Sequence, residues 1–351
     1  MLMRSPGPGS GTAPAPRPVR SRRAALLGYG LIAALVLLAV ATLLSVGVGT
    51  RAIPPADVWH ALVTPTGTRN DEVVRELRVP RTLIGLAAGA ALGLAGTVMQ
   101  ALTRNPLADP GLLGVNAGAS AAVVTAIGIL GLDSPAAYTW FALVGAGAAA
   151  VLVQSLAGGR SATPVRLVLA GTALNAALLA YVKGLQLFDL ETLDSMRFWT
   201  LGTLARRDTG QLVQILPFLV AGVLLGLFLT GSLNALALGD DTARALGTHV
   251  ERTRWLSVVA ITLLCGATTA LCGPIGFVGL MIPHAVRAFT GPDLRWAVPY
   301  SMLLAASLLL LSDVVGRLVA YPSEIEVGLV TAAIGSVILI LLVRGRRTAA
   351  L

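Results

Sequence analysis

The sequence predicts an all-α polytopic membrane protein with about ten transmembrane helices. Of its 351 residues, 55% are hydrophobic and only 12% are charged, and the mean hydropathy is +0.80. A soluble globular domain has about 25% charged residues, so this chain cannot cover a water-facing surface. Its uncharged intervals are also long enough to cross a membrane, because about 20 helical residues span the roughly 30 Å of bilayer hydrocarbon.

The intervals without Asp, Glu, Lys or Arg give the predicted spans in order. The clearest are residues 24–50, 82–103, 110–132, 134–159, 209–239 and 255–286. The last is interrupted by GPIG at 273–276, which predicts one span before the break and a shorter one after it. Weaker windows lie at 164–186, 296–319 and 325–343. Small residues crowd the second span, LIGLAAGAALGLAG, which predicts close packing against neighbouring helices.

The two chain ends predict the orientation. The first 23 residues are rich in Pro, Gly and Arg and are expected to form a disordered cytoplasmic tail. A signal peptide is the alternative, but the apolar run that follows is too long for one and lacks a clear cleavage site. An uncleaved first span and ten crossings place both termini in the cytoplasm. The predicted division is a tail at 1–23, a transmembrane domain at 24–345 and a tail at 346–351.

The arginines agree only modestly with the positive-inside rule in this orientation. Arg78, Arg81 and Arg317 fall at external helix ends, where orientation alone gives no reason for them. One explanation is that their guanidinium groups reach lipid phosphates. The basic composition does not indicate nucleic-acid binding, since the arginines are scattered between apolar runs with few aromatic residues among them.

The residues needed for an energy source are scarce. A phosphate-binding loop ends in Lys-Ser or Lys-Thr, but the single lysine, Lys183, lies in YVKGLQ. An ion-coupled carrier usually places acidic or histidine relay groups within the membrane. The best candidate is Asp313 in LLLSDVVGR, and Arg317 one turn later is its expected salt-bridge partner. A structural pair is favoured over a proton relay.

The sequence also lacks clear catalytic and metal-binding motifs. His60, His249 and His284 are far apart in sequence, and none has a metal-ligand spacing or an adjacent nucleophile. Cys265 and Cys272 lie in apolar stretches, where a thiol usually serves packing. The chain is therefore predicted to be a conduit, not an enzyme, with no cofactor or metal of its own.

One polar segment between two long spans predicts a docking surface. It reads LNALALGDDTARALGTHVERTRWL, at residues 233–256. Gly239 and Gly247 can break the chain, and the acids at the start of DDTARAL suit a short helix. We expect two short helices, joined at a glycine on the inner face, that dock a soluble partner. An ordinary solvated loop is the alternative.

Residues 78–120, RVPRTLIGLAAGAALGLAGTVMQALTRNPLADPGLLGVNAGAS, closely resemble the signature block of the FecCD-type permeases. These are membrane subunits of ATP-binding-cassette (ABC) importers for iron-siderophores, haem and cobalamin. Further similar blocks follow in order: LVLAGTALN, FWTLGTL, LNALALGDDTARALG, GPIGFVGLMIPHAVR and EIEVGLVTAAIG. The resemblance implies a cobalamin-permease-like fold and a permease subunit that carries a ferric-siderophore or related metal chelate across the bacterial cytoplasmic membrane. A stand-alone secondary transporter using Asp313 is the rival interpretation.

The resemblance also implies an assembly. The chain would pair with a second permease subunit, as a homodimer or heterodimer, within the membrane lipid. Two cytoplasmic ABC ATPase subunits would bind ATP and Mg beneath it, and an extracytoplasmic substrate-binding protein would dock above it. No nucleic acid is expected among the partners.

Functional residues can be carried over from the resemblance at matching positions. The coupling helices would span 236–250 and present Gly239, Asp240, Ala243, Arg244, Leu246 and Gly247 to the ATPase. Asn105 and Leu107 match the cytoplasmic gate, and Thr163 and Pro164 would form its other constriction, although small polar residues are usual at position 164. Arg78, Arg81 and Arg317 match outer-rim positions that pair with a glutamate on each lobe of the binding protein.

Overall fold

The computed structural model describes residues 19–132, 134–159, 163–205 and 207–348, and the regular elements in these ranges are all helices. The elements up to the middle of the chain are α1 (Val19–Gly47), α2 (Pro55–Val63), α3 (Arg69–Glu72), the π-helix η1 (Val73–Arg78), α4 (Val79–Thr103), the 3₁₀ helix η2 (Pro110–Leu113), α5 (Val115–Gly128), α6 (Pro135–Leu156) and α7 (Pro164–Phe188). Those that follow are α8 (Leu190–Leu201), α9 (Thr209–Phe228), α10 (Thr230–Leu236), α11 (Asp240–Ala245), α12 (Val250–Cys272), α13 (Val278–Thr290), α14 (Leu294–Val319) and α15 (Val327–Thr348).

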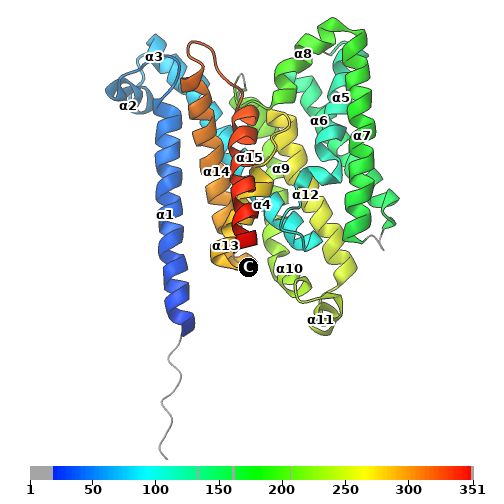
Figure 1. Ribbon diagram of the computed structural model, residues 1–351. Helices are drawn as coiled ribbons and strands as arrows, with labels where there is room; N and C mark the ends of the chain where they lie inside the picture. The colour runs from blue at the N-terminus through cyan, green and yellow to red at the C-terminus, as the bar shows by residue number, and fades with distance from the viewer. Residues whose placement is uncertain (1–18, 133, 160–162, 206, 349–351) are drawn as a thin grey trace, which may run out of the picture.

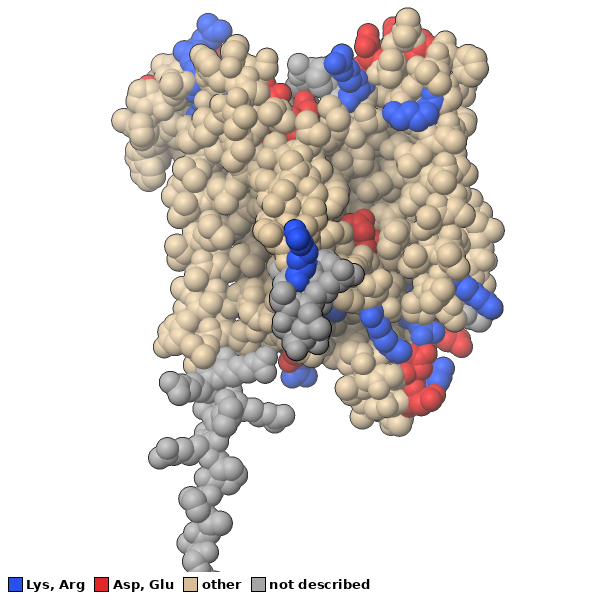
Figure 2. Space-filling view, viewed as in Figure 1, with Lys and Arg blue, Asp and Glu red and all other residues tan. Residues whose placement is uncertain are grey.

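The long helices run side by side and form one bundle (Figure 1). Within the described ranges, seven helices are long and apolar enough to cross a membrane, and α5 and part of α15 are shorter apolar helices. With the short α13 after the break at 273–276, they account for the ten predicted spans. The chain is therefore an integral membrane protein. Charged side chains of the face in Figure 2 gather mostly at its upper and lower ends, and tan surface lies between them.

The bundle is built around α4, which packs against α9, α12, α13 and α14. Glycines permit this close approach, as the run of small residues predicted. A Cβ at Gly93 would lie 2.3 Å from the carbonyl oxygen of Ser301 on α14, and one at Gly96 would lie 1.8 Å from that of Gly279 on α13. These positions accept no side chain without movement of a neighbouring backbone. By contrast, α1 and α7 are mostly exposed along their apolar lengths.

Short elements cover the two ends of the bundle. In Figure 1, α2, α3 and α8 lie at the upper end, and α10 and α11 lie at the lower end. The chain passes from α10 to α11 through Gly239, and a second turn at Gly247 leads toward α12. The φ angles of these glycines are +111° and +81°, in the left-handed region that other residues rarely adopt. The predicted pair of short helices joined at a glycine is thus present, although only α11 lies wholly inside 236–250.

The predicted domain limits differ slightly from the helix ends. α1 begins at Val19, so residues 19–23 belong to its first turns, and the rest of the predicted tail lies outside the described residues. α15 likewise continues past residue 345 to Thr348. Hydropathy marks where a helix enters the membrane, whereas the helix itself can continue into water with good helix formers such as arginine.

Candidate functional site

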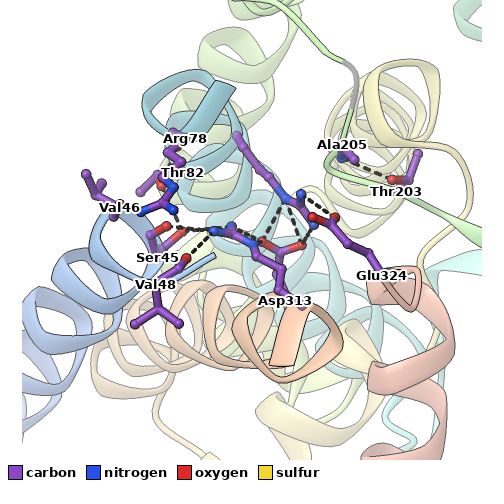
Figure 3. A network of polar contacts seen from close by, with 11 residues as sticks. Ser45, Val46, Val48, Arg78, Thr82, Thr203, Ala205, Asp313 and Glu324 are labelled. Atoms are coloured by element: carbon purple, nitrogen blue, oxygen red, sulfur yellow. Dashed lines mark hydrogen bonds and ion pairs between the residues drawn. The ribbon is translucent and has the colours of Figure 1, made fainter. Parts of the chain in front are cut away.

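A network of buried charges lies at the upper end of the bundle (Figure 3). Asp313 of α14 is fully buried and accepts hydrogen bonds from two arginines. The Nε of Arg81 on α4 lies 3.0 Å from each of its carboxylate oxygens, and the Nε of Arg317 lies 3.0 Å from Oδ2. Arg81 also donates to Glu324, at 2.7 Å, in the connection before α15. The predicted Asp313–Arg317 pair is confirmed, with Arg81 as an additional partner.

Arg317 and a further arginine, Arg78, form hydrogen bonds to the upper end of α1. The last carbonyl groups of a helix have no partner within it. Here Arg78 donates to the carbonyl oxygens of Val46 and Gly47, at 3.1 and 2.6 Å. From α14, Arg317 donates to those of Ser45 and Val48, at 2.8 and 2.9 Å. The two guanidinium groups therefore join a peripheral helix to the centre of the bundle.

The three arginines of the outer-rim prediction differ in how much of each side chain is accessible. Arg78 and Arg317 are only 5% and 2% exposed and are held by their own chain, so they offer no free surface to a partner. Only the side chain of Arg81 keeps some exposure. The prediction relied on the position of each arginine at the end of its own helix. That position does not reveal that α1 ends nearby and offers its carbonyl oxygens to Arg78 and Arg317.

A cavity of about 540 Å³ lies beside this network. Arg78, Arg81, Arg317, Glu324 and Glu326 line part of it. Arg51 and Arg207 also line it, and neither has a carboxylate partner among the described residues. Arg207 makes one long contact, 3.5 Å, with the hydroxyl of Tyr138, and its buried Nε has no hydrogen-bond partner. Sequence reasoning did not single out Arg51 and Arg207, because each lies in a connection between helices.

A second cavity, of about 440 Å³, separates α5, α7 and α8. Its polar lining consists of Asp109, Asn116, Ser120, Asn175, Lys183 and Thr200. Two of these side chains also form hydrogen bonds to neighbouring elements, one to a backbone carbonyl and one to another side chain. Asn175 donates to the carbonyl oxygen of Gly111, at 3.0 Å, and Asn116 accepts from Thr269, at 2.8 Å. The polar residues inside otherwise apolar spans are the signal that could have found this cavity.

The predicted gate residues lie on two elements of the structure. Asn105 and Leu107 belong to the turn that follows α4, and both are exposed. The Oδ1 of Asn105 accepts from the backbone amide of Leu107, at 2.9 Å, which keeps the turn compact. Thr163 caps α7 by accepting from the amide of Arg166, and Pro164 is the first residue of that helix.

The predicted coupling residues surround α11, and most of them are accessible. Arg244, Leu246 and Gly247 are exposed, and Gly239 and Asp240 are partly exposed. Ala243 is the exception, because it is fully buried. It lies on the face of α11 that packs on neighbouring helices, among them α12. Asp240 is also engaged within the chain, by Arg104 and Arg254.

Comparisons with known proteins identify the fold and the family. The sequence matches the FecCD transport family over residues 37–345. The chain belongs to this family. It is 46% identical to the ferric enterobactin transport system permease protein FepD of Escherichia coli (strain K12), over 88% of this chain and 93% of that protein. It is 40% identical to the Fe(3+)-citrate import system permease protein YfmD of Bacillus subtilis (strain 168), over 87% and 91%.

A solved structure agrees with this assignment. It is described as an inward-facing conformation of a metal-chelate type ABC transporter and matches with a TM-score of 0.81. The match has 30% sequence identity and covers 91% of this chain and 99% of the other. This FecCD-family member is therefore a permease subunit of the ABC importer type, in which ATP hydrolysis belongs to partner subunits. The interpretation as an ion-coupled secondary transporter is not supported.

Proposed function

We propose that this permease carries a ferric-siderophore or related metal chelate across a bacterial cytoplasmic membrane. The observation that carries the proposal is the match to permeases of ferric enterobactin and ferric citrate systems along nearly the whole transmembrane region. The cavity between α5, α7 and α8, which mixes polar and apolar lining residues, is consistent with such a cargo. It offers several neutral hydrogen-bonding groups and few charges, so a bulky polar chelate can pass without being held tightly.

The cargo class is tested by uptake of radiolabelled iron in cells that lack only this permease. Catecholate, citrate, hydroxamate and haem complexes should be supplied one at a time. We expect loss of uptake for one chelate class and its recovery when the permease is restored. Unchanged uptake of all four complexes would contradict the proposal. Competition by the unlabelled chelate then separates the true cargo from compounds that enter by another route.

We propose that the lower end of the bundle in Figure 1 faces the cytoplasm, together with both termini. A second permease subunit, identical or related, would complete the translocation path within the lipid. Two ATPase subunits, which bind the ATP and Mg, would dock on α11. This docking is supported by the exposed apolar side chains of Leu238 and Leu246 beside the exposed Arg244, because apolar groups flanked by charges are typical of interfaces.

We also propose that an extracytoplasmic binding protein docks at the basic cavity of the upper end. The support is charge. Five arginines and two glutamates line this cavity, so it favours a partner that presents carboxylates. Arg81 is the member of the predicted rim set that is still accessible. Arg51 and Arg207 are the better anchors, because their guanidinium groups have no carboxylate partner to give up among the described residues.

A further inference from the structure

Asp240, the first residue of α11, is bound by arginines from two other helices. The Nη2 of Arg254, in the second turn of α12, lies 2.7 Å from its Oδ2. Arg104, the residue that ends α4, forms an ion pair with its Oδ1. Both carboxylate oxygens are thus occupied, by residues 14 and 136 positions away in the sequence. Arg104, Asp240 and Arg254 together are called the lower triad below.

Arg104 also begins the turn that contains the predicted gate residues. Its φ angle is +51°, in the left-handed region, and this backbone conformation ends α4. Within the turn, the amide of Ala108 donates to the carbonyl oxygen of Asn105, at 3.2 Å. The carbonyl oxygen of Pro106 lies 3.1 Å from the Nδ1 of His284 on α13. The compact turn at 104–108 is therefore tied to α11 at one side and to α13 at the other.

We propose that the Arg104–Asp240 ion pair transmits the displacement of α11 to the turn at 104–108. The inference rests on the proposed function, in which α11 docks the ATPase and this turn gates the path. Asp240 then acts as a positioning residue inside the permease. In this proposal Asp240 does not contact the ATPase, which is the role that the family resemblance implies for it.

The surroundings of Asp240 fit this assignment. A new ATPase cation would compete with two arginines for a carboxylate that has no free oxygen. The neighbouring Asp241 is fully exposed, and its ion-pair partner is Arg244 of the same helix. Asp241 is therefore the acidic residue of α11 that is accessible to the ATPase. Partial burial raises the pKa of Asp240. The hydrogen bonds and charges of Arg104 and Arg254 lower this pKa by a larger amount, so the net shift is downward. Asp240 is therefore ionised at neutral pH.

The test uses the complete importer, reconstituted in proteoliposomes with its ATPase and binding protein. Arg104→Ala removes the link to the turn and leaves the Asp240–Arg254 pair in place. We expect normal co-purification of the ATPase, with at least a threefold rise in ATP hydrolysed per chelate imported. Arg104→Lys, which keeps one charge for Asp240, should restore much of the coupling. Arg252→Ala, at an exposed position in the first turn of α12 and outside the triad, is the control and should behave as the unmodified importer.

A second measurement reports on the turn itself. Leu107 is 45% exposed, whereas the native Cys265 and Cys272 are both buried. A cysteine at position 107 (Leu107→Cys) should therefore be the fast-reacting thiol toward a water-soluble reagent. We expect ATP to change its reaction rate in the otherwise unmodified importer and to leave that rate unchanged when Arg104→Ala is added.

The outcomes separate this inference from the proposed function. Normal coupling and a normal ATP response in Arg104→Ala would overturn the inference while the importer still transports. Loss of ATPase association in Arg104→Ala would also overturn it, because the residue would then serve docking. Failure of the unmodified complex to import any chelate would instead contradict the proposed function.

Discussion

Asp313 is predicted to be the charged residue on which the stability of the bundle depends most. Replacing it by Asn keeps the size of the side chain and removes the charge. Arg81 would still have Glu324 as a carboxylate partner, at 2.7 Å. Arg317 would lose its salt-bridge partner, and only 2% of its side chain is exposed. The substitution therefore leaves one buried cation with no directly contacting carboxylate in the described part of the chain.

The size of the effect follows from burial. Removing one partner of a buried ion pair costs about 3–5 kcal/mol, because the remaining charge is desolvated and uncompensated. Arg317 keeps its hydrogen bonds to the carbonyl oxygens of Ser45 and Val48, which offset part of this cost. We therefore expect Asp313→Asn to lower the free energy of unfolding by about 3 kcal/mol, the lower end of that range.

The matched control is Glu324→Gln, which acts on the same Arg81 from a more exposed position. The side chain of Glu324 is 31% exposed, so its loss should cost only about 0.2–1 kcal/mol. The assay is denaturation of the purified permease in detergent, with the free energy of unfolding compared among the three proteins. Equal, small effects of both substitutions would refute the reasoning. A second outcome would also refute it. If transport by the unmodified protein depended on a proton gradient and transport by a stable Asp313→Asn protein did not, Asp313 would be a proton relay.

Three further predictions concern other parts of the chain. Arg51→Ala with Arg207→Ala should weaken binding-protein affinity by about 0.2–1 kcal/mol for each residue and reduce its salt dependence, measured by association across a salt series. An unchanged affinity and salt slope would show that neither residue contacts the binding protein. Gly96→Ala should destabilise the bundle by about 1–3 kcal/mol or prevent folding, because its Cβ would meet the carbonyl oxygen of Gly279. Gly28→Ala, whose Cβ would have nothing within 4 Å, is the control, and equal thermal stability of the two variants would contradict the close packing at Gly96. The pKa of Asp240 is lowered, so its ion pairs are fully present above the ordinary Asp value of about 3.9 and are lost only as pH falls through the lower folded value; ATP hydrolysed per chelate should thus be constant between about pH 5 and 8, and a titration inside that range would exclude Asp240 as the link.

Local signals in the sequence predicted the helices and the breaks between them. Hydropathy located the spans, the glycines of α4 predicted its close packing, and Gly239 and Gly247 predicted the turns around α11. Each of these features depends on the residue itself and a few neighbours, so its pattern is visible in a short window. Helix ends were less accurate, because hydropathy reports the membrane boundary and not the last hydrogen-bonded turn.

The polar contacts of the candidate site could not be predicted in the same way. Arg317 was assigned to the outer surface, yet it donates to the carbonyl oxygen of Ser45, 272 residues away. Arg104 and Asp240 meet across 136 residues. Neither contact leaves a spacing pattern in the sequence, since it depends on which helix ends come together in the bundle. The Asp313–Arg317 pair could be predicted because its members are one helical turn apart.

The most direct test of the account is the energy source of transport. The permease should be reconstituted in proteoliposomes with its ATPase and binding protein, and chelate uptake should be followed with ATP on the side of α11. The account predicts uptake that requires hydrolysable ATP, stops when the ATPase is omitted and is unaffected by a protonophore. Uptake by the permease alone, driven by a pH gradient and abolished by a protonophore, would contradict it.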